Sequence, residues 1–152
     1  MFMRMKEWLN EKKRNGKKQK NAQHSILIVS ANEQERRNLQ QILEREGYRL
    51  LFAENGEEGL NITDRQRPSL ILLDMEIRAM SGIEMCRRVK ESQITCHIPV
   101  IFLTESNTPR SILECFEVDA ENYLTKPVNR KSLVLQVAAI LEEFSAKQNS
   151  LA

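Results

Sequence analysis

The stretch Ser69-Leu-Ile-Leu-Leu-Asp74 decides the fold, because four consecutive apolar residues end on a single carboxylate. Pro68 precedes the run and a loop follows it, which is typical of a short strand buried on both faces of a parallel sheet. An ionised side chain is costly inside such a strand, but open parallel sheets bind ligands at the carboxyl ends of their strands. Asp74 is therefore the leading candidate for a functional residue. The alternative is that Asp74 only ends the strand in a surface turn.

Short apolar runs and amphipathic segments alternate along the chain from Ser25 onward. The expected strands cover residues 26–29, 48–52, 69–73, 98–103 and 122–125. Helices are expected at 33–46 and 56–66 and after Gly82, Thr108 and Asn129, with cap residues Asn32, Asn55, Thr108 and Asn129. Strict alternation of strands and helices predicts an α/β fold, in which helices cover both faces of a five-stranded parallel sheet.

The residues that follow the strands should meet in one crevice at the carboxyl edge of this sheet. They are Ser30, Ala31, Asp74, Thr104 and Lys126. A carboxylate, a hydroxyl and an ammonium group together suit a phosphoryl group, because the carboxylate can act as nucleophile while the other two hold oxygens. Taken singly, each of these residues also has an ordinary structural explanation. No glycine-rich phosphate loop follows the first strand, which speaks against nucleotide binding.

Residues 25–146 resemble the receiver domain of bacterial two-component response regulators. The matching segments are Ile26-Leu-Ile-Val29, Leu70-Ile-Leu-Leu-Asp74, Met80-Ser-Gly82, Pro99-Val-Ile-Phe-Leu-Thr104 and Tyr123-Leu-Thr-Lys-Pro127. The resemblance implies a flavodoxin-like, doubly wound (βα)5 fold with strand order 2-1-3-4-5. It implies that a histidine kinase phosphorylates Asp74, that Thr104 and Tyr123 respond as switch residues, and that Lys126 binds the phosphate. The Lys126–Pro127 peptide would be cis, as in the family.

The sequence departs from the family pattern around the phosphoacceptor. Receivers usually carry two acidic residues after the first strand, which bind Mg²⁺ with the phosphoacceptor, whereas this chain has Ser30 and Ala31. Mg²⁺ needs oxygen ligands, so we expect a weak or absent Mg²⁺ site, with Asp74 and Glu76 as its candidate ligands. Glu76 would either block the pocket or partly replace the missing ligands. Glu105, beside the switch threonine, would repel an incoming phosphate.

These departures lead us to expect an atypical receiver of the pseudo-receiver type rather than an enzyme. Asp74 is retained, and signalling would rest on protein contact, with a histidine kinase or another signalling protein as partner. The contact surface would be the fourth helix, fifth strand and fifth helix of the domain, through which members of this build often form homodimers. The chain ends soon after the last helix, so we expect a stand-alone receiver. A conventional phosphorylated regulator with a rebuilt metal site is the first alternative.

Charge divides the chain into two parts. Residues 1–24 carry eight Lys/Arg against two Glu, a net charge of +6, and the remainder carries 15 against 19, a net charge of −4. The start, up to Leu9, is compatible with a short amphipathic helix, but residues 11–21 have too little apolar surface to order themselves. We therefore expect a basic, flexible arm at 1–24, the receiver at 25–146 and a tail at 147–152. A second alternative function is binding of nucleic acid or anionic membrane through this arm.

Cysteine content and hydropathy point to a cytoplasmic protein. The three cysteines, Cys86, Cys96 and Cys115, are odd in number and lack the spacing of metal ligands, so we expect reduced thiols in the core. No apolar stretch approaches the roughly 20 residues that a membrane-spanning helix needs. The start of the chain lacks the apolar core and cleavage site of a signal peptide.

Overall fold

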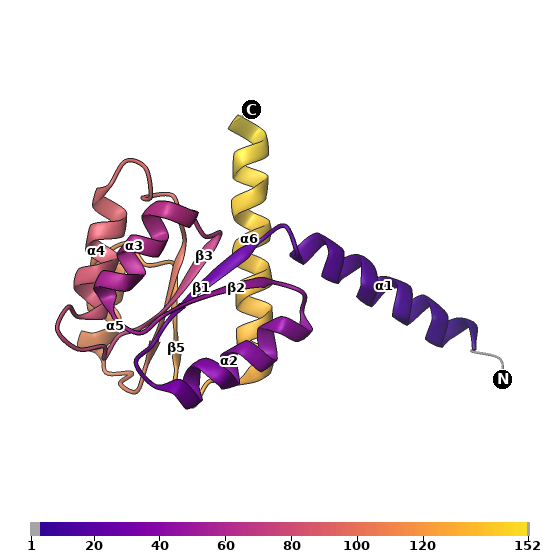
Figure 1. Cartoon of the computed structure of the whole chain (residues 1–152), viewed down its shortest axis with the longest axis horizontal. Coiled ribbons are helices and arrows are strands. Elements are labelled where there is room, and N and C mark those ends of the chain that lie inside the picture. Colours follow the sequence, from indigo (N-terminus) through magenta and orange to yellow (C-terminus); the bar gives the residue numbers. More distant parts are fainter. Residues whose placement is uncertain (1–3, 152) are drawn as a thin grey trace.

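The computed structural model describes residues 4–151, and side chains up to residue 147. The strands are β1 (Ser25–Val29), β2 (Arg49–Ala53), β3 (Leu70–Asp74), β4 (Val100–Thr104) and β5 (Asn122–Thr125). The helices are α1 (Met5–Asn21), α2 (Glu33–Arg45), α3 (Gly56–Gln66), α4 (Gly82–Glu91), α5 (Pro109–Glu117) and α6 (Arg130–Leu151). The five strands form one parallel sheet in the order β2-β1-β3-β4-β5, which confirms the expected fold (Figure 1).

Alternate residues of the central strands face opposite layers of helices, as the period of two in a strand requires. Even-numbered residues of β1 and β3, such as Ile28 and Leu72, pack with side chains of α2 and α6. Odd-numbered residues, such as Val29 and Leu73, pack with side chains of α4 and of the segment around α5. Both faces of β1, β3 and β4 are therefore covered, which is why these strands are almost continuously apolar.

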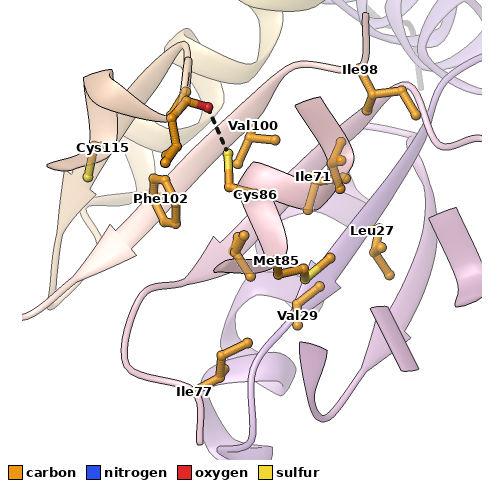
Figure 2. Packing of buried hydrophobic residues seen from close by; sticks show 14 of the residues in the cluster. Leu27, Val29, Ile71, Ile77, Met85, Cys86, Ile98, Val100, Phe102 and Cys115 are labelled. Atoms are coloured by element: carbon orange, nitrogen blue, oxygen red, sulfur yellow. Dashed lines mark hydrogen bonds between the residues drawn. The ribbon is translucent and has the colours of Figure 1, made fainter. Parts of the chain in front are cut away.

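The layer formed with α4 contains two of the three cysteines (Figure 2). The Cys86 thiol lies 3.5 Å from the Val118 carbonyl oxygen, and burial raises the pKa of Cys86 to about 12. Cys115 is also buried, and its burial raises its pKa to about 11. Thiols with such high pKa values are packing residues with little thiolate at neutral pH. Cys96, in contrast, is exposed, so the expectation that all three cysteines are core residues is wrong.

Side-chain caps mark where all five helices of the domain begin, including α4, where the Ser81 hydroxyl accepts a hydrogen bond from the Glu84 backbone N–H. The side chains of Asn32, Asn55 and Thr108 each accept a hydrogen bond from the backbone N–H three residues later. Asn129 does the same for Ser132 at the start of α6. Asn32, Asn55, Thr108 and Asn129 are the cap residues expected from the sequence. They satisfy backbone donors that a helix leaves without an intrahelical partner.

The two ends of the chain differ from expectation. Instead of a short helix followed by an unordered segment, residues 5–21 form one continuous helix, α1, which extends from the sheet edge (Figure 1). Apart from Gly16, its residues are mostly good helix formers, with Glu7 in the first turn and Lys18 and Lys20 in the last, where they favour the helix dipole. The last helix extends to Leu151 rather than ending near residue 146. The boundary between arm and domain stays a prediction.

The exposed side of α5 carries large apolar side chains. Leu113 and Phe116 are 58% and 49% exposed, and the buried residue of this helix is Cys115. Leu135 on α6 is exposed as well. Among the described residues, no helix is both long and apolar enough to cross a membrane.

Candidate functional site

Asp74 lies at the carboxyl end of the central strand β3 and is 7% exposed. Its Oδ1 atom accepts a hydrogen bond of 2.9 Å from the backbone N–H of Glu76. The start of α4 packs directly against this strand end, because a Cβ atom at Gly82 would lie 2.7 Å from the Asp74 carbonyl oxygen. Glycine at position 82 therefore allows the close approach of helix and strand that shapes this side of the site.

Lys126 lies among three carboxylates that come from three different elements. Its Nζ atom is 2.9 Å from Asp74 Oδ1, 3.2 Å from Glu35 Oε1 and 3.6 Å from Glu76 Oε2. Burial alone would lower the pKa of Lys126, but the hydrogen bond and charge of Asp74, with those of Glu35, outweigh it and raise the pKa. The ammonium group is therefore fully charged at neutral pH and neutralises part of the carboxylate cluster.

Glu76 connects Thr104 to this cluster. Its Oε1 atom accepts hydrogen bonds from the Thr104 hydroxyl at 2.9 Å and from the Glu105 backbone N–H at 3.1 Å. The Thr104 hydroxyl, at the end of β4, also accepts a hydrogen bond from the Ser106 N–H at 3.1 Å. One carboxylate thus contacts a hydroxyl, a backbone N–H and an ammonium group, which are the donor types that bind phosphate oxygens in proteins. The Glu76 side chain remains 41% exposed.

Glu35 is the site residue that the sequence analysis missed. It lies in the first turn of α2, and its Oε2 atom accepts a 2.5 Å hydrogen bond from the hydroxyl of the fully buried Ser30. Asn32 and Glu35 have the spacing of a capping box, in which the acidic side chain usually returns to the cap residue. Here the Glu35 carboxylate instead enters the site, where Ser30 and Lys126 hold it. The sequence predicted the cap at Asn32 but not this contact of Glu35.

The remaining residues proposed from the sequence lie around this centre. Ala31 and Glu105 are exposed, and it is the backbone of Glu105 that contacts the site. Tyr123 is half-buried and meets Phe116 edge to face, with 6.4 Å between ring centroids, so it belongs to the α5–β5 surface. The Lys126–Pro127 peptide is cis. Asp74, Glu35, Glu76 and Lys126 line a cleft of about 430 Å³, which the start of α2 borders.

The arrangement of these residues does not fit a bound Mg²⁺ ion. Within residues 4–147, no group of three or more His, Cys, Asp or Glu side chains is placed to hold a metal. The Lys126 ammonium lies among the three carboxylates that would otherwise supply ligands, and Ala31 offers only a methyl group. Mg²⁺ prefers a near-octahedral set of oxygen ligands, which this arrangement lacks.

The fold and the site together define a doubly wound α/β domain with a carboxylate at the end of its central strand. The family model for the response regulator receiver domain matches residues 26–138, and the chain belongs to this family. It is 37% identical over 117 residues to the phosphate regulon transcriptional regulatory protein PhoB of Pseudomonas aeruginosa, covering 77% of this chain and 51% of PhoB. It is 36% identical over 120 residues to the transcriptional regulatory protein ResD of Bacillus subtilis, covering 79% and 49% of the two chains.

Solved structures agree with this assignment. A putative response regulator from Chloroflexus aurantiacus is 29% identical, with a TM-score of 0.76, over 78% of this chain and 98% of that one. The chain spans about half the length of the curated relatives it matches. Receiver domains are generally signalling modules rather than enzymes, typically bind Mg²⁺ at the phosphorylation site, and act with histidine kinases and other signalling proteins.

Proposed function

We propose that this chain is an atypical receiver domain that signals through protein contact and does not depend on phosphorylation of Asp74. The observation that carries this proposal is the position of the Glu76 carboxylate, which contacts the Thr104 hydroxyl, the Glu105 N–H and the Lys126 ammonium. A phosphoryl group on Asp74 would need the same donors. Glu76 would have to leave before Thr104 and Lys126 could bind phosphoryl oxygens.

Electrostatic repulsion also opposes phosphorylation of Asp74. A phosphoryl group would enter a cleft in which three carboxylates surround a single ammonium group, and Glu105 lines the same cleft. The charge that develops during phosphoryl transfer is normally stabilised by a metal ion, and the donor set described above does not fit Mg²⁺. Like charges at these distances oppose each other, so both the approach of the phosphodonor and the transfer step should be unfavourable.

A conventional receiver with a rebuilt metal site is the second candidate, and one observation favours it. The Glu35 carboxylate reaches the cleft from α2, next to the position where the family has its acidic pair. If Lys126 withdrew, then Glu35, Asp74 and Glu76 would present carboxylate oxygens of the kind that Mg²⁺ takes. On this hypothesis, Glu35→Gln and Glu76→Ala should each abolish Mg²⁺ binding.

The two candidates make opposite predictions for acyl phosphorylation. Intact-mass spectrometry after incubation with acetyl phosphate and Mg²⁺ measures the phosphoryl adduct, and Asp74→Asn is the negative control. We expect no adduct on the wild-type chain and no Mg²⁺ binding by calorimetry. A stoichiometric adduct that is present on wild type and absent from Asp74→Asn would contradict the proposal.

Glu76→Ala sharpens this test, because it releases the donors that Glu76 occupies. If Glu76 competes with the phosphoryl group, the variant should be phosphorylated more than wild type, whereas the metal-site hypothesis requires it to be phosphorylated less. Glu105→Ala is the matched control, since it removes a carboxylate from the same cleft while the backbone N–H at position 105 stays. A larger gain in Glu105→Ala than in Glu76→Ala would contradict a specific role for Glu76.

The contact surface that we propose for signalling is formed by α5, β5 and α6. It carries the exposed side chains of Leu113, Phe116 and Leu135, and Tyr123 packs against Phe116. Covering exposed apolar groups of this kind with a partner lowers the free energy of the complex. A second copy of this chain is the partner that we propose first, and Phe116→Asp should then convert a dimer to a monomer in sedimentation measurements. An unchanged oligomeric state would contradict a homodimer through this face.

A further inference from the structure

We propose that the cleft between α1, α2 and α6 is a binding site for phosphate groups, separate from the site around Asp74. The cleft has a volume of about 220 Å³ and is lined by Arg14, Lys17, Lys18, Arg45, Glu46 and Arg130. Five of these six residues are cations. They come from three segments that are far apart in the sequence, so the cluster exists only because the C-terminal end of α1 contacts the turn after α2.

Three contacts hold the C-terminal half of α1 against the body of the domain. Lys17 Nζ lies 2.9 Å from Glu46 Oε1, and the Asn21 side-chain amide donates a 2.6 Å hydrogen bond to the Glu46 carbonyl oxygen. At Gly47, where φ is +94°, an added Cβ atom would lie 2.7 Å from Lys18 Cα. The backbone of α1 therefore rests directly on the turn between α2 and β2, which brings Arg14 and Lys18 into the same cleft as Arg45.

The charges in the cleft are not balanced by the protein. Among the residues that line it in the described part of the chain, Glu46 is the single carboxylate, and it already forms an ion pair with Lys17. This excess of four cations lies beside a domain whose residues 25–152 carry a net charge of −4. Bringing like charges together is unfavourable, and a bound anion would remove that cost. The cleft is therefore prepared for a ligand with more than one negative charge.

The residue types and the size of the cleft indicate which anion fits. Arginine binds phosphate oxygens through two parallel N–H donors, and three of the five cations are arginines. A volume of about 220 Å³ is below the roughly 300–1,000 Å³ of pockets that enclose drug-sized ligands. None of the lining residues is aromatic, so the cleft offers no surface for stacking a nucleobase. These features favour a small phosphate anion such as pyrophosphate over a whole nucleotide.

Calorimetric titration with sodium pyrophosphate at constant ionic strength tests this proposal. We expect saturable binding to the full chain and a loss of about tenfold or more in affinity for Arg45→Gln/Arg130→Gln, because two arginine contacts to phosphate are removed. The matched control is Arg65→Gln/Arg110→Gln, which removes two exposed arginines from α3 and α5. Absence of saturable binding, or an equal loss in both double variants, would overturn the proposal. Circular dichroism of each variant checks that it is folded.

Trp8, the single tryptophan, reports on α1 without a label. Because the anion would bridge α1 to Arg45 and Arg130, pyrophosphate should raise the fluorescence anisotropy of Trp8 in wild type but not in the cleft variant. An anisotropy that does not change while pyrophosphate binds would contradict the participation of α1.

Two further titrations identify the source of the phosphate. Tighter binding of a DNA duplex than of pyrophosphate, lost in the same cleft variant, would assign the site to phosphates of a nucleic acid backbone. Binding of anionic lipid vesicles that is equal in wild type and in the cleft variant, without pyrophosphate binding, would show that the cleft is not the site.

Discussion

The site around Asp74 and the cleft beside α1 differ in how their charged groups are paired. At the carboxyl edge of the sheet, one ammonium group lies among three carboxylates, and its side chain is only 16% exposed. In the cleft, five cations surround one carboxylate, and Lys17 remains 52% exposed. In the first region one internal cation contacts all three carboxylates, whereas in the second four of the five cations have no carboxylate partner in the cleft and are left to solvent or to a ligand.

The difference shows which region should respond to changes in the protein and which should respond to added ions. Internal ion pairs that are partly buried are weakly screened, so removing one partner affects folding. Exposed cations are strongly solvated, so removing one affects binding far more than folding.

Lys126→Met should destabilise the domain most. It leaves three carboxylates without their common cation, and removing one member of a largely buried ionic cluster typically costs about 3 kcal/mol. Urea unfolding at neutral pH measures the loss, and Lys131→Met, an exposed lysine on α6, is the matched control. A Lys126 variant as stable as the Lys131 variant would show that the cluster is not balanced by Lys126.

Alkaline pH should reproduce part of this effect in the wild-type chain. The pKa of Lys126 is raised in the folded state because Asp74 and Glu35 outweigh the effect of burial. Its stabilising contribution is therefore complete below the ordinary lysine pKa of roughly 10.4 and is lost as pH rises through the folded-state value. The difference in unfolding free energy between wild type and Lys126→Met should stay constant from pH 8 to about 10 and then decrease. If this difference in unfolding free energy instead grows as pH rises above 8, the stabilising role of the charged Lys126 is contradicted.

Gly47→Ala should loosen α1 with a moderate loss of stability. Alanine is strained at a φ of +94°, and its Cβ would overlap the backbone of Lys18, so we expect a cost of about 1 to 2 kcal/mol. Trp8 anisotropy should decrease in this variant because α1 would separate from the body. Gly16→Ala is the control and should raise stability rather than lower it. Nothing lies within 4 Å of its added Cβ, and alanine favours the helix by up to about 1 kcal/mol. Equal effects of the two changes would contradict the packing of α1 on Gly47.

Lys17→Ala should have the smallest effect on folding. Lys17 is the exposed partner of its ion pair with Glu46, and pairs with one solvated partner contribute about 0.5 kcal/mol or less. The variant also relieves repulsion from the neighbouring cations, which offsets part of that loss. Chemical denaturation should place its stability within about 0.5 kcal/mol of wild type, whereas pyrophosphate binding weakens. A loss as large as that of Lys126→Met would mean that the cleft is a structural ion-pair network rather than a binding site.

Most of the fold was predictable because its signals are local. The apolar run at 70–73 is a strand because both of its faces are covered, and Asn32, Asn55, Thr108 and Asn129 cap helices because their side chains reach backbone donors three residues later. The disorder expected at 11–21 was wrong for a physical reason. Low apolar content predicts that a segment buries little surface, but α1 forms from helix propensity and is held by contacts to Glu46 and Gly47.

The candidate site was only partly predictable. Asp74, Thr104 and Lys126 converge because the carboxyl ends of parallel strands share one edge of the sheet, which alternation alone indicates. Glu35 lies on a helix rather than at a strand end, so the strand-end pattern did not include it. For Glu76 the sequence left two roles open, which were blocking the pocket and replacing the missing metal ligands. Its contact with Thr104 depends on the side-chain conformation that the loop after β3 permits.

By itself, the sequence determined the parallel α/β sheet, the family and the carboxylate at the end of β3, because hydrophobic periodicity, capping and strand-end position are properties of short segments. Only the tertiary structure decided that Lys126 is surrounded by Glu35, Asp74 and Glu76, and that cations of α1 meet Arg45 and Arg130. Both clusters join segments that are far apart in the chain. Electrostatic interactions depend on distance in space, and the folded chain alone sets those distances.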